Sequence, residues 1–162
     1  MDTKVKPCLA IIHANDRPDS LAYINRKIKA IERLGFLHQY YKFDSNQLVD
    51  ISARIQALNQ DTAVHGIMIQ SPLYDSASVL FEDLVKHIDD QKDVDGLKQS
   101  SPYTSCTALA VLEILRFYNI TPRQKQVLVV GRSKTVGDPI ARLLRKYGGH
   151  VSVSHSGTDR NE

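Results

Sequence analysis

The sequence has little cysteine and no concentration of charge. Only Cys8 and Cys106 occur among 162 residues, with no CxxC pair and no Cys/His spacing suited to zinc. A disulfide framework and a metal site are therefore not expected, and two thiols fit a reducing, cytoplasmic location. The formal net charge is +3, with acidic and basic residues interspersed. We therefore expect neither a nucleic-acid partner nor a membrane partner.

Long apolar runs and internal repeats are also missing. No stretch approaches the roughly 20 apolar residues of a membrane-spanning helix. The apolar run near the N-terminus is broken by His13, Asn15 and Asp16, which excludes a signal peptide there. With 42% hydrophobic and 24% charged residues, the composition is typical of a globular protein with one core or two small ones.

The sequence does contain an alternation of apolar runs and helical periodicity, which predicts an α/β fold. The Pro-containing polar link "TPRQK", just after Asn119, is the best candidate for a domain boundary. It divides the chain into residues 1–119, with three strands, and residues 120–162, with a single strand–helix–strand unit. The expected strands are 8–13, 36–43, 64–70, 127–130 and 151–154.

One predicted helix, in the run "LAYINRKIKAIERLG", carries a lysine on its apolar face. At about 100° per residue, Lys27 falls among Ile24, Ile28 and Ile31, one turn after Tyr23. Two interpretations stay open. The side chain reaches past apolar surface to solvent, or it lies in a partly desolvated pocket where a lysine can donate and accept protons.

The stretch "VVGRSKTVGDP" has a second functional pattern, a buried strand, a turn with two glycines and a helix opened by a proline. This pattern is typical of phosphate-binding turns, because backbone N–H groups at a helix N-terminus face an anion. It departs from G-x-G-x-x-G, since Ser133 replaces the second glycine and Gly137 comes one residue late. The generic pattern alone leaves dinucleotide binding undecided.

Two further segments bear on function. "VHGIMIQSPL" is a buried strand ending at Gln70, and "KDVDGL" is a turn with Asp93 and Asp95. Taken singly, they could be an ordinary polar strand end and an Asp-Gly turn. A calcium loop is excluded because Pro102 stands where the EF-hand pattern requires a glutamate.

Taken in order, "RPDSLAYINRKIKAIERLG", "VHGIMIQSPL", "KDVDGL" and "VVGRSKTVGDP" resemble the bifunctional methylenetetrahydrofolate dehydrogenase/cyclohydrolases. The resemblance runs from about residue 7 to residue 158. Tyr-x-x-x-Lys also occurs in short-chain dehydrogenases, but there the glycine-rich turn precedes the pair, whereas here Gly131 follows Tyr23 and Lys27. The order of motifs therefore favours the folate family.

The resemblance implies a catalytic three-layer α/β domain followed by a partial Rossmann-like NADP-binding unit, usually in a homodimer. It implies an oxidoreductase and hydrolase of one-carbon metabolism that acts on tetrahydrofolate derivatives. By the same resemblance, Tyr23 stacks on the folate ring system and Lys27 is catalytic, positioned by a hydrogen bond from Gln70. Asp95 would bind the pterin, whose adjacent ring N–H and exocyclic amine match the two oxygens of a carboxylate.

The family's turn has the form Gly-Arg-Ser-x-x-Val-Gly-x-Pro, which this sequence matches from Gly131 to Pro139. An NAD-specific site would show an acidic residue at the end of the next strand, but His155 and Ser156 stand there. With Arg132, these residues suit the 2′-phosphate of NADP. The resemblance implies that NADP is bound by Gly131, Arg132, Ser133, Gly137 and Ser156.

The sequence also departs from the family. It ends just past the second strand of the cofactor domain, so it resembles a C-terminally truncated member without the later strands and the loop that closes over folate. The connection "KQSSPYTSCTALA" is shorter than usual, and Ser71 replaces an apolar residue. Two hypotheses follow. The chain is an enzyme whose dehydrogenase activity is reduced more than its cyclohydrolase activity, or it is a non-catalytic remnant that binds folate, a nucleotide or a full-length relative.

Overall fold

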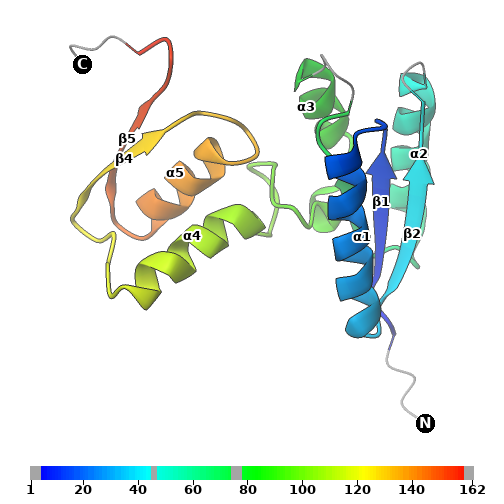
Figure 1. Cartoon of the computed structure of the whole chain (residues 1–162), viewed down its shortest axis with the longest axis horizontal. Helices are drawn as coiled ribbons and strands as arrows, with labels where there is room; N and C mark the ends of the chain where they lie inside the picture. Colours follow the sequence, from blue (N-terminus) through cyan, green and yellow to red (C-terminus); the bar gives the residue numbers. More distant parts are fainter. Residues whose placement is uncertain (1–4, 45–46, 74–77, 159–162) are drawn as a thin grey trace. The chain divides into compact units, whose positions relative to one another are not determined.

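The computed structural model describes residues 5–44, 47–73 and 78–158. The chain divides into two compact units, Met1–Val94 and Asp95–Glu162. In chain order (Figure 1) the elements are β1 (Cys8–His13), α1 (Pro18–Arg33), β2 (Leu37–Lys42), α2 (Leu48–Gln60), β3 (Gly66–Ile69), α3 (Ser78–Lys86), the short 3₁₀ helix η1 (Asp90–Lys92), α4 (Cys106–Phe117), β4 (Gln126–Val130), α5 (Gly137–Lys146) and β5 (His150–Ser154).

The first unit is built on a parallel three-stranded sheet with the order β2-β1-β3. The connections from β1 to β2 and from β2 to β3 run in opposite directions across the sheet. Right-handed crossovers therefore put α1 and α2 on opposite faces, and Figure 1 shows α1 in front of the sheet and α2 behind it. The three-layer α/β architecture expected for this part of the chain is confirmed.

The core of the first unit fills both faces of the sheet. On one face, Ile24 of α1 packs against Ile11 and Met68 of the strands. Because successive strand residues point to opposite faces, the alternate positions belong to the α2 side. Fully or almost fully buried apolar side chains occupy that side, from the strands and from α2 at helical spacing: Ala10, Ile12, Ile67, Ile69, Ile51, Ile55 and Leu58.

Helix α1 begins at Pro18, whose restricted φ suits the first turn of a helix. It ends in a glycine turn, because Gly35 has a φ of +72°. The N–H of Gly35 donates to the carbonyl of Glu32 (2.9 Å), and the N–H of Phe36 donates to that of Ile31 (3.1 Å). These bonds satisfy carbonyls at the helix end and turn the chain directly into β2.

The second unit is a parallel β4–β5 pair joined by α5. Ala141 and Leu144 of α5 pack on Val129 of β4. Leu143 packs instead against Leu112 of α4. Helix α4 is thus part of this unit, so the division between the compact units lies before α4, whereas the sequence interpretation placed a boundary after Asn119. The Pro-containing link connects α4 to β4 inside the second unit.

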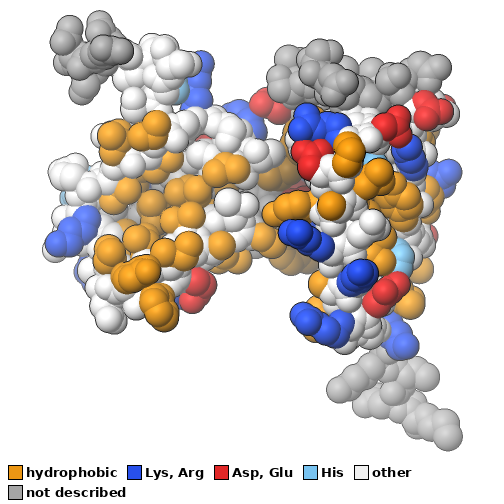
Figure 2. Space-filling model, viewed as in Figure 1, with side chains coloured by type: hydrophobic (Ala, Val, Ile, Leu, Met, Phe, Trp, Pro, Cys, Tyr) orange, Lys and Arg blue, Asp and Glu red, His pale blue; other side chains and the backbone are white. Residues whose placement is uncertain are grey.

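Apolar side chains remain exposed on the second unit. Val127, Val129, Val151 and Val153 lie in the cluster with α5. The alternate position Val130 points away from it and is 80% exposed. Figure 2 also shows hydrophobic side chains gathered over α4, where Ile114, Phe117 and Tyr118 are exposed. The β4–β5 sheet is therefore covered on one face, unlike the sheet of the first unit.

Candidate functional site

Lys27 lies on α1, against the end of β3. Its amine Nζ is 5.5 Å from the centre of the Tyr23 ring and 3.7 Å from Met68 Sδ. Lys27 is half-buried, whereas Tyr23 is 59% exposed. Among the residues that the structure describes, the amine has no carboxylate partner. This intermediate burial of Lys27 is compatible with both interpretations left open by the helical pattern.

Gln70 follows β3 directly. Its backbone N–H donates to the carbonyl of Ile12 (2.8 Å), which extends the β1–β3 pairing by one residue. Its side-chain Nε2 donates to the carbonyl of Ser71 (2.8 Å). The expected hydrogen bond between Lys27 and Gln70 is thus not formed, since Nε2 is engaged locally and Lys27 contacts sulfur. Gln70 Oε1 is buried and has no hydrogen-bond partner among the residues described, which leaves an acceptor open beside β3.

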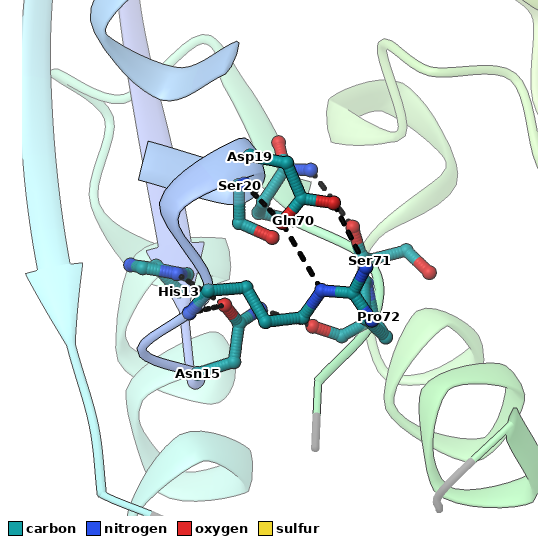
Figure 3. A network of polar contacts seen from close by, with 8 residues as sticks. His13, Asn15, Asp19, Ser20, Gln70, Ser71 and Pro72 are labelled. Carbon is teal, nitrogen blue, oxygen red and sulfur yellow. Dashed lines mark hydrogen bonds and ion pairs between the residues drawn. The ribbon is translucent and has the colours of Figure 1, made fainter. Parts of the chain in front are cut away.

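A partly buried polar network links the loops that follow β1 and β3 (Figure 3). His13 is fully buried, with Nδ1 2.8 Å from the Tyr40 hydroxyl and Nε2 3.2 Å from Asn15 Oδ1. Asn15 Nδ2 donates to the carbonyl of Pro72, which follows a cis peptide bond from Ser71. Burial raises the pKa of Tyr40. Sequence analysis missed this network, and its only local signal is the polar pair closing an apolar run.

The start of α1 carries an ion pair next to this network. Arg17 Nη2 lies 2.8 Å from Asp19 Oδ2, and Asp19 Oδ1 accepts a hydrogen bond from the N–H of Ser20 (2.9 Å). The hydrogen bond from Arg17 holds the pKa of the Asp19 carboxyl below its ordinary value. Because both side chains are largely exposed, the pair serves mainly to order the chain where it enters α1.

Asp95 lies just beyond a segment fixed against β3. Asp93 is buried and forms an isolated parallel bridge with Ile67. Gly66 lets Val94 approach, because a Cβ at Gly66 would lie 2.7 Å from Val94 Cγ1. Asp95 itself is half-buried and begins the second unit. The first unit thus brings together Tyr23, Lys27 and Gln70, while Asp95 is described with the second unit.

The glycine turn after β4 is held by hydrogen bonds, one to β5 and one within the turn. The N–H of Gly131 donates to the carbonyl of Ser154 (2.7 Å), and its φ of +111° favours glycine. A Cβ at Gly137 would lie 2.2 Å from the carbonyl oxygen of Gly131, so only glycine fits there. The Gly137 N–H donates to Ser133 Oγ (3.3 Å). A side-chain oxygen therefore occupies the position at the start of α5 that an anion would take.

Ser156 lies in a turn next to this glycine turn. His155 holds that turn, since its N–H donates to Thr158 Oγ1 (2.9 Å) and its Nδ1 accepts from the N–H of Gly157 (3.0 Å). Val130 pairs with Ser154 across the parallel strands, so both turns leave the same edge of the sheet. Arg132, Ser133 and Ser156 are exposed there. Arg132, the two serine hydroxyl groups and the start of α5 can face an anionic ligand at this edge, and Asp138 in the first turn of α5 is paired with Arg142.

Both cysteines are free thiols, Cys8 buried and Cys106 exposed, and burial raises the pKa of Cys8. Within the described residues, no cluster of three or more His, Cys, Asp or Glu side chains could hold a metal ion. No helix in the same part of the chain combines the length and apolar character needed to cross a membrane.

Comparisons with known proteins agree with this division of the chain. Residues 1–95 match the family model of the tetrahydrofolate dehydrogenase/cyclohydrolase catalytic domain, and residues 105–162 match that of its NAD(P)-binding domain. The bifunctional protein FolD of Acidovorax sp. (strain JS42) is 34% identical over 177 residues, which cover 97% of this chain and 59% of the relative.

Solved structures are similar over the same extent. The FolD methylenetetrahydrofolate dehydrogenase/cyclohydrolase of Campylobacter jejuni has a TM-score of 0.85 at 34% identity, covering 96% of this chain and 58% of that chain. The Trypanosoma brucei enzyme, complexed with NADP and an inhibitor, has a TM-score of 0.82 at 30% identity, covering 94% and 55%. The chain thus spans little more than half the length of these relatives.

Proposed function

Because the chain belongs to the tetrahydrofolate dehydrogenase/cyclohydrolase family, we propose that it acts in one-carbon folate metabolism. The reactions are hydrolysis of 5,10-methenyltetrahydrofolate and NADP-dependent oxidation of 5,10-methylenetetrahydrofolate. The observation that most supports this proposal is the environment of Lys27. Its amine is half-buried between an exposed aromatic ring and a thioether, where it can face a flat ligand stacked on Tyr23.

In the hydrolysis, Lys27 assists attack of water on the cationic methenyl group. Among the described residues, no carboxylate pairs with the Lys27 amine, which contacts the Tyr23 ring and Met68 Sδ. A thioether is only a weak acceptor, so the amine keeps donor capacity for water or folate. The unpartnered Gln70 Oε1 can accept a hydrogen bond from that amine or from the attacking water. Gln70 is therefore proposed as a positioning residue.

Asp95 is proposed to bind the pterin through paired hydrogen bonds to its two carboxylate oxygens. Replacing it by alanine leaves the pterin donors facing an apolar group, which costs about 1.5–3 kcal/mol for a charged hydrogen bond. We expect Asp95→Ala to weaken folate binding by about tenfold or more. An unchanged folate dissociation constant in calorimetric titration would assign "KDVDGL" to a structural turn only.

The edge of the β4–β5 sheet fits NADP. The helix start at Gly137 and the backbone around Gly131 suit a pyrophosphate, and Arg132 with Ser156 suits a 2′-phosphate. When bound, NADP supplies the hydride acceptor. Gly131, Arg132, Ser133, Gly137 and Ser156 would bind and orient it.

The decisive experiment compares Lys27→Ala with Lys29→Ala, which removes an exposed lysine from the same helix. Hydrolysis of 5,10-methenyltetrahydrofolate is followed by absorbance, and circular dichroism checks that each variant is folded. We expect Lys27→Ala to lose about 10²–10⁴-fold in rate, the usual contribution of an acid–base group, and Lys29→Ala to match the wild type. Hydrolysis at the wild-type rate in Lys27→Ala would refute the assignment.

A second candidate is a non-catalytic chain that associates with a full-length relative. It is favoured by the exposed apolar positions on β4, where Leu128 is 64% exposed and Val130 is 80% exposed. The same assays distinguish the two functions. Folate binding without turnover in either assay, together with complex formation with a full-length FolD, supports the second function over the first.

We also propose a cytoplasmic homodimer. The apolar side chains over α4 (Figure 2) and on β4 offer surface for a second copy. The two free thiols fit a reducing compartment, and the net charge of +3 gives no reason to expect nucleic acid or membrane as a partner. Sedimentation equilibrium measures the assembly. A monomer at micromolar concentration would contradict the dimer.

A further inference from the structure

The second unit contains a cavity of about 220 Å³ on a face of α5, away from the residues proposed to bind NADP. Its walls are α5 and the segment 96–105, and none of Gly131, Arg132, Ser133, Gly137 and Ser156 lines it. A cavity needs only about 10–15 Å³ to admit one water molecule. This one has room for a small organic molecule, and the proposed function leaves it unassigned.

The α5 wall is positively charged. Arg142 and Lys146 line the cavity from successive turns of the helix, and no aspartate or glutamate lines it. Arg142 Nε lies 3.4 Å from Asp138 Oδ2 on the same helix. Among the described residues, the buried Nε has no hydrogen-bond partner, so this contact with Asp138 is an ion pair and not a hydrogen bond. The wall thus keeps a net positive charge and an incompletely satisfied guanidinium.

The opposite wall supplies hydroxyl groups, from Ser101, Tyr103, Thr104 and Ser105. Gly96 fixes this wall. Its φ is +63°, and a Cβ there would lie 2.6 Å from the N of Ser105 and 2.7 Å from the carbonyl oxygen of Tyr103. The segment is therefore held close by backbone contact, and Ser105 is almost completely buried. The backbone of residues 103–105 is therefore already in place when a ligand binds.

We propose that this cavity binds a phosphate group carried by a small molecule. A phosphate monoester has three terminal oxygens, which can accept hydrogen bonds from the guanidinium and ammonium on one wall and from hydroxyl groups on the other. A metal cation is disfavoured, because the lining contains two cationic side chains and no carboxylate. Pro139 and Leu143 on the α5 wall offer apolar surface to the carbon part of the ligand.

The test is a ¹⁵N–¹H NMR titration of the intact chain with inorganic phosphate and with glycerol 3-phosphate. Glycerol and sodium chloride at matched ionic strength are the blanks. We expect saturable shifts of backbone amides in residues 99–105 and 140–146. Shifts in residues 131–137 and 155–158 report separately on the proposed nucleotide site, so the two sites are distinguished in one experiment.

Three variants localise the binding. We expect Arg142→Gln and Lys146→Gln each to weaken binding at residues 99–105 and 140–146 by at least tenfold. Lys125→Gln removes an exposed charge from the same unit and should leave it unchanged. Arg142→Lys retains the charge without the planar fork and should give an intermediate affinity, which keeps the test decisive if Arg142→Gln does not fold.

Comparing inorganic phosphate with glycerol 3-phosphate shows whether the ligand is the free ion or a phosphorylated molecule. Tighter binding of glycerol 3-phosphate than of inorganic phosphate supports a small phosphorylated molecule as the ligand. Equal affinities would overturn that assignment and leave a site for the free ion. Absence of shifts in residues 99–105 and 140–146, or equal shifts in wild type and Arg142→Gln, would overturn the site itself.

Discussion

The two units present functional groups at sheet edges in different ways. In the first unit the groups are side chains, Lys27 and Tyr23 on α1 and Gln70 at the end of β3, supported by a sheet covered on both faces. In the second unit they are largely backbone N–H groups of a turn, next to a sheet covered on one face. We therefore expect Tyr23, Lys27 and Gln70 to tolerate substitution without loss of the fold, whereas a Cβ at Gly137 would meet the carbonyl oxygen of Gly131.

The largest expected effect is on stability, and it separates the sheet covered on both faces from the sheet covered on one. Ile12 is fully buried in the first sheet, whereas Leu128 of the second sheet is 64% exposed. We expect Ile12→Ala to lower the free energy of unfolding by about 2–5 kcal/mol through lost burial and a cavity. Leu128→Ala should change it by no more than about 0.5 kcal/mol. Urea denaturation of both variants measures this, and equal losses would show that the exposed face of β4 is covered in solution.

The glycine turn predicts the next largest effect. In Gly137→Ala the new Cβ meets the carbonyl oxygen of Gly131, and the backbone has to move. We expect a loss of about 1–3 kcal/mol in stability together with loss of NADP binding. Gly35→Ala is the control, because a Cβ added at Gly35 meets no atom within 4 Å and only its φ of +72°, which Gly137 does not share, opposes the change.

For Gly35→Ala we expect a cost of about 1 kcal/mol from the left-handed backbone and unchanged NADP binding. Differential scanning calorimetry and NADP titration measure both quantities. If Gly137→Ala bound NADP as well as wild type, the closed geometry of the turn would not be required for the cofactor.

Sequence patterns predicted most of the fold, because the strands and α1 are set by local apolar periodicity. The strand Cys8–His13 matches residue for residue, and the other strands differ only at their ends. Helices α3 and η1 were not predicted. The 3₁₀ helix depends on long-range contacts, since Lys92 Nζ donates to the carbonyls of Leu58 and Asp61 (2.7 Å each). No local pattern around residues 90–92 encodes those partners.

Only the local contacts of the candidate site could be predicted, because long-range partners leave no local sequence pattern. Helical spacing alone places Tyr23 beside Lys27, and the contact is observed. The hydrogen bond expected between Lys27 and Gln70 is not formed among the described residues, because Lys27 Nζ contacts Met68 Sδ and Gln70 Nε2 donates to the carbonyl of Ser71. The His13–Asn15–Pro72 network could not be predicted, because it requires knowing that β1 and β3 are neighbours. The proposed roles of the site residues stay predictions.

A smaller effect is expected on the preference for NADP over NAD, which depends on the second unit. Arg132 is exposed at the edge of the β4–β5 sheet, where we expect it to contact the 2′-phosphate of NADP. Arg132→Gln should lower the preference for NADP over NAD by about tenfold, or about 1.4 kcal/mol. Lys134→Gln, in the same turn, is the control. Calorimetric titration with both cofactors measures the ratio, and an unchanged ratio would remove Arg132 from the proposed site.

The smallest expected effect is on the pH dependence of stability, through the exposed Arg17–Asp19 ion pair of the first unit. The hydrogen bond from Arg17 holds the pKa of Asp19 below its ordinary value of 3.8. A depressed pKa in the folded state stabilises the protein above the unfolded value and ceases to do so as pH falls through the folded value. Asp19→Asn should therefore melt slightly below wild type at pH 7, with the difference vanishing in strong acid. A difference that grows as pH falls would contradict this linkage.

The strand order of the first unit also determines when its core can form during synthesis. Strand β1 pairs with β2 and with β3, both of which come later in the chain. As the chain leaves the ribosome, the apolar run of β1 emerges before either neighbour exists, and it stays unpaired on one side until Ile69 has emerged. Residues are added at about 5–20 per second, so β1 waits for seconds. The core of the first unit therefore cannot close before β3 has emerged.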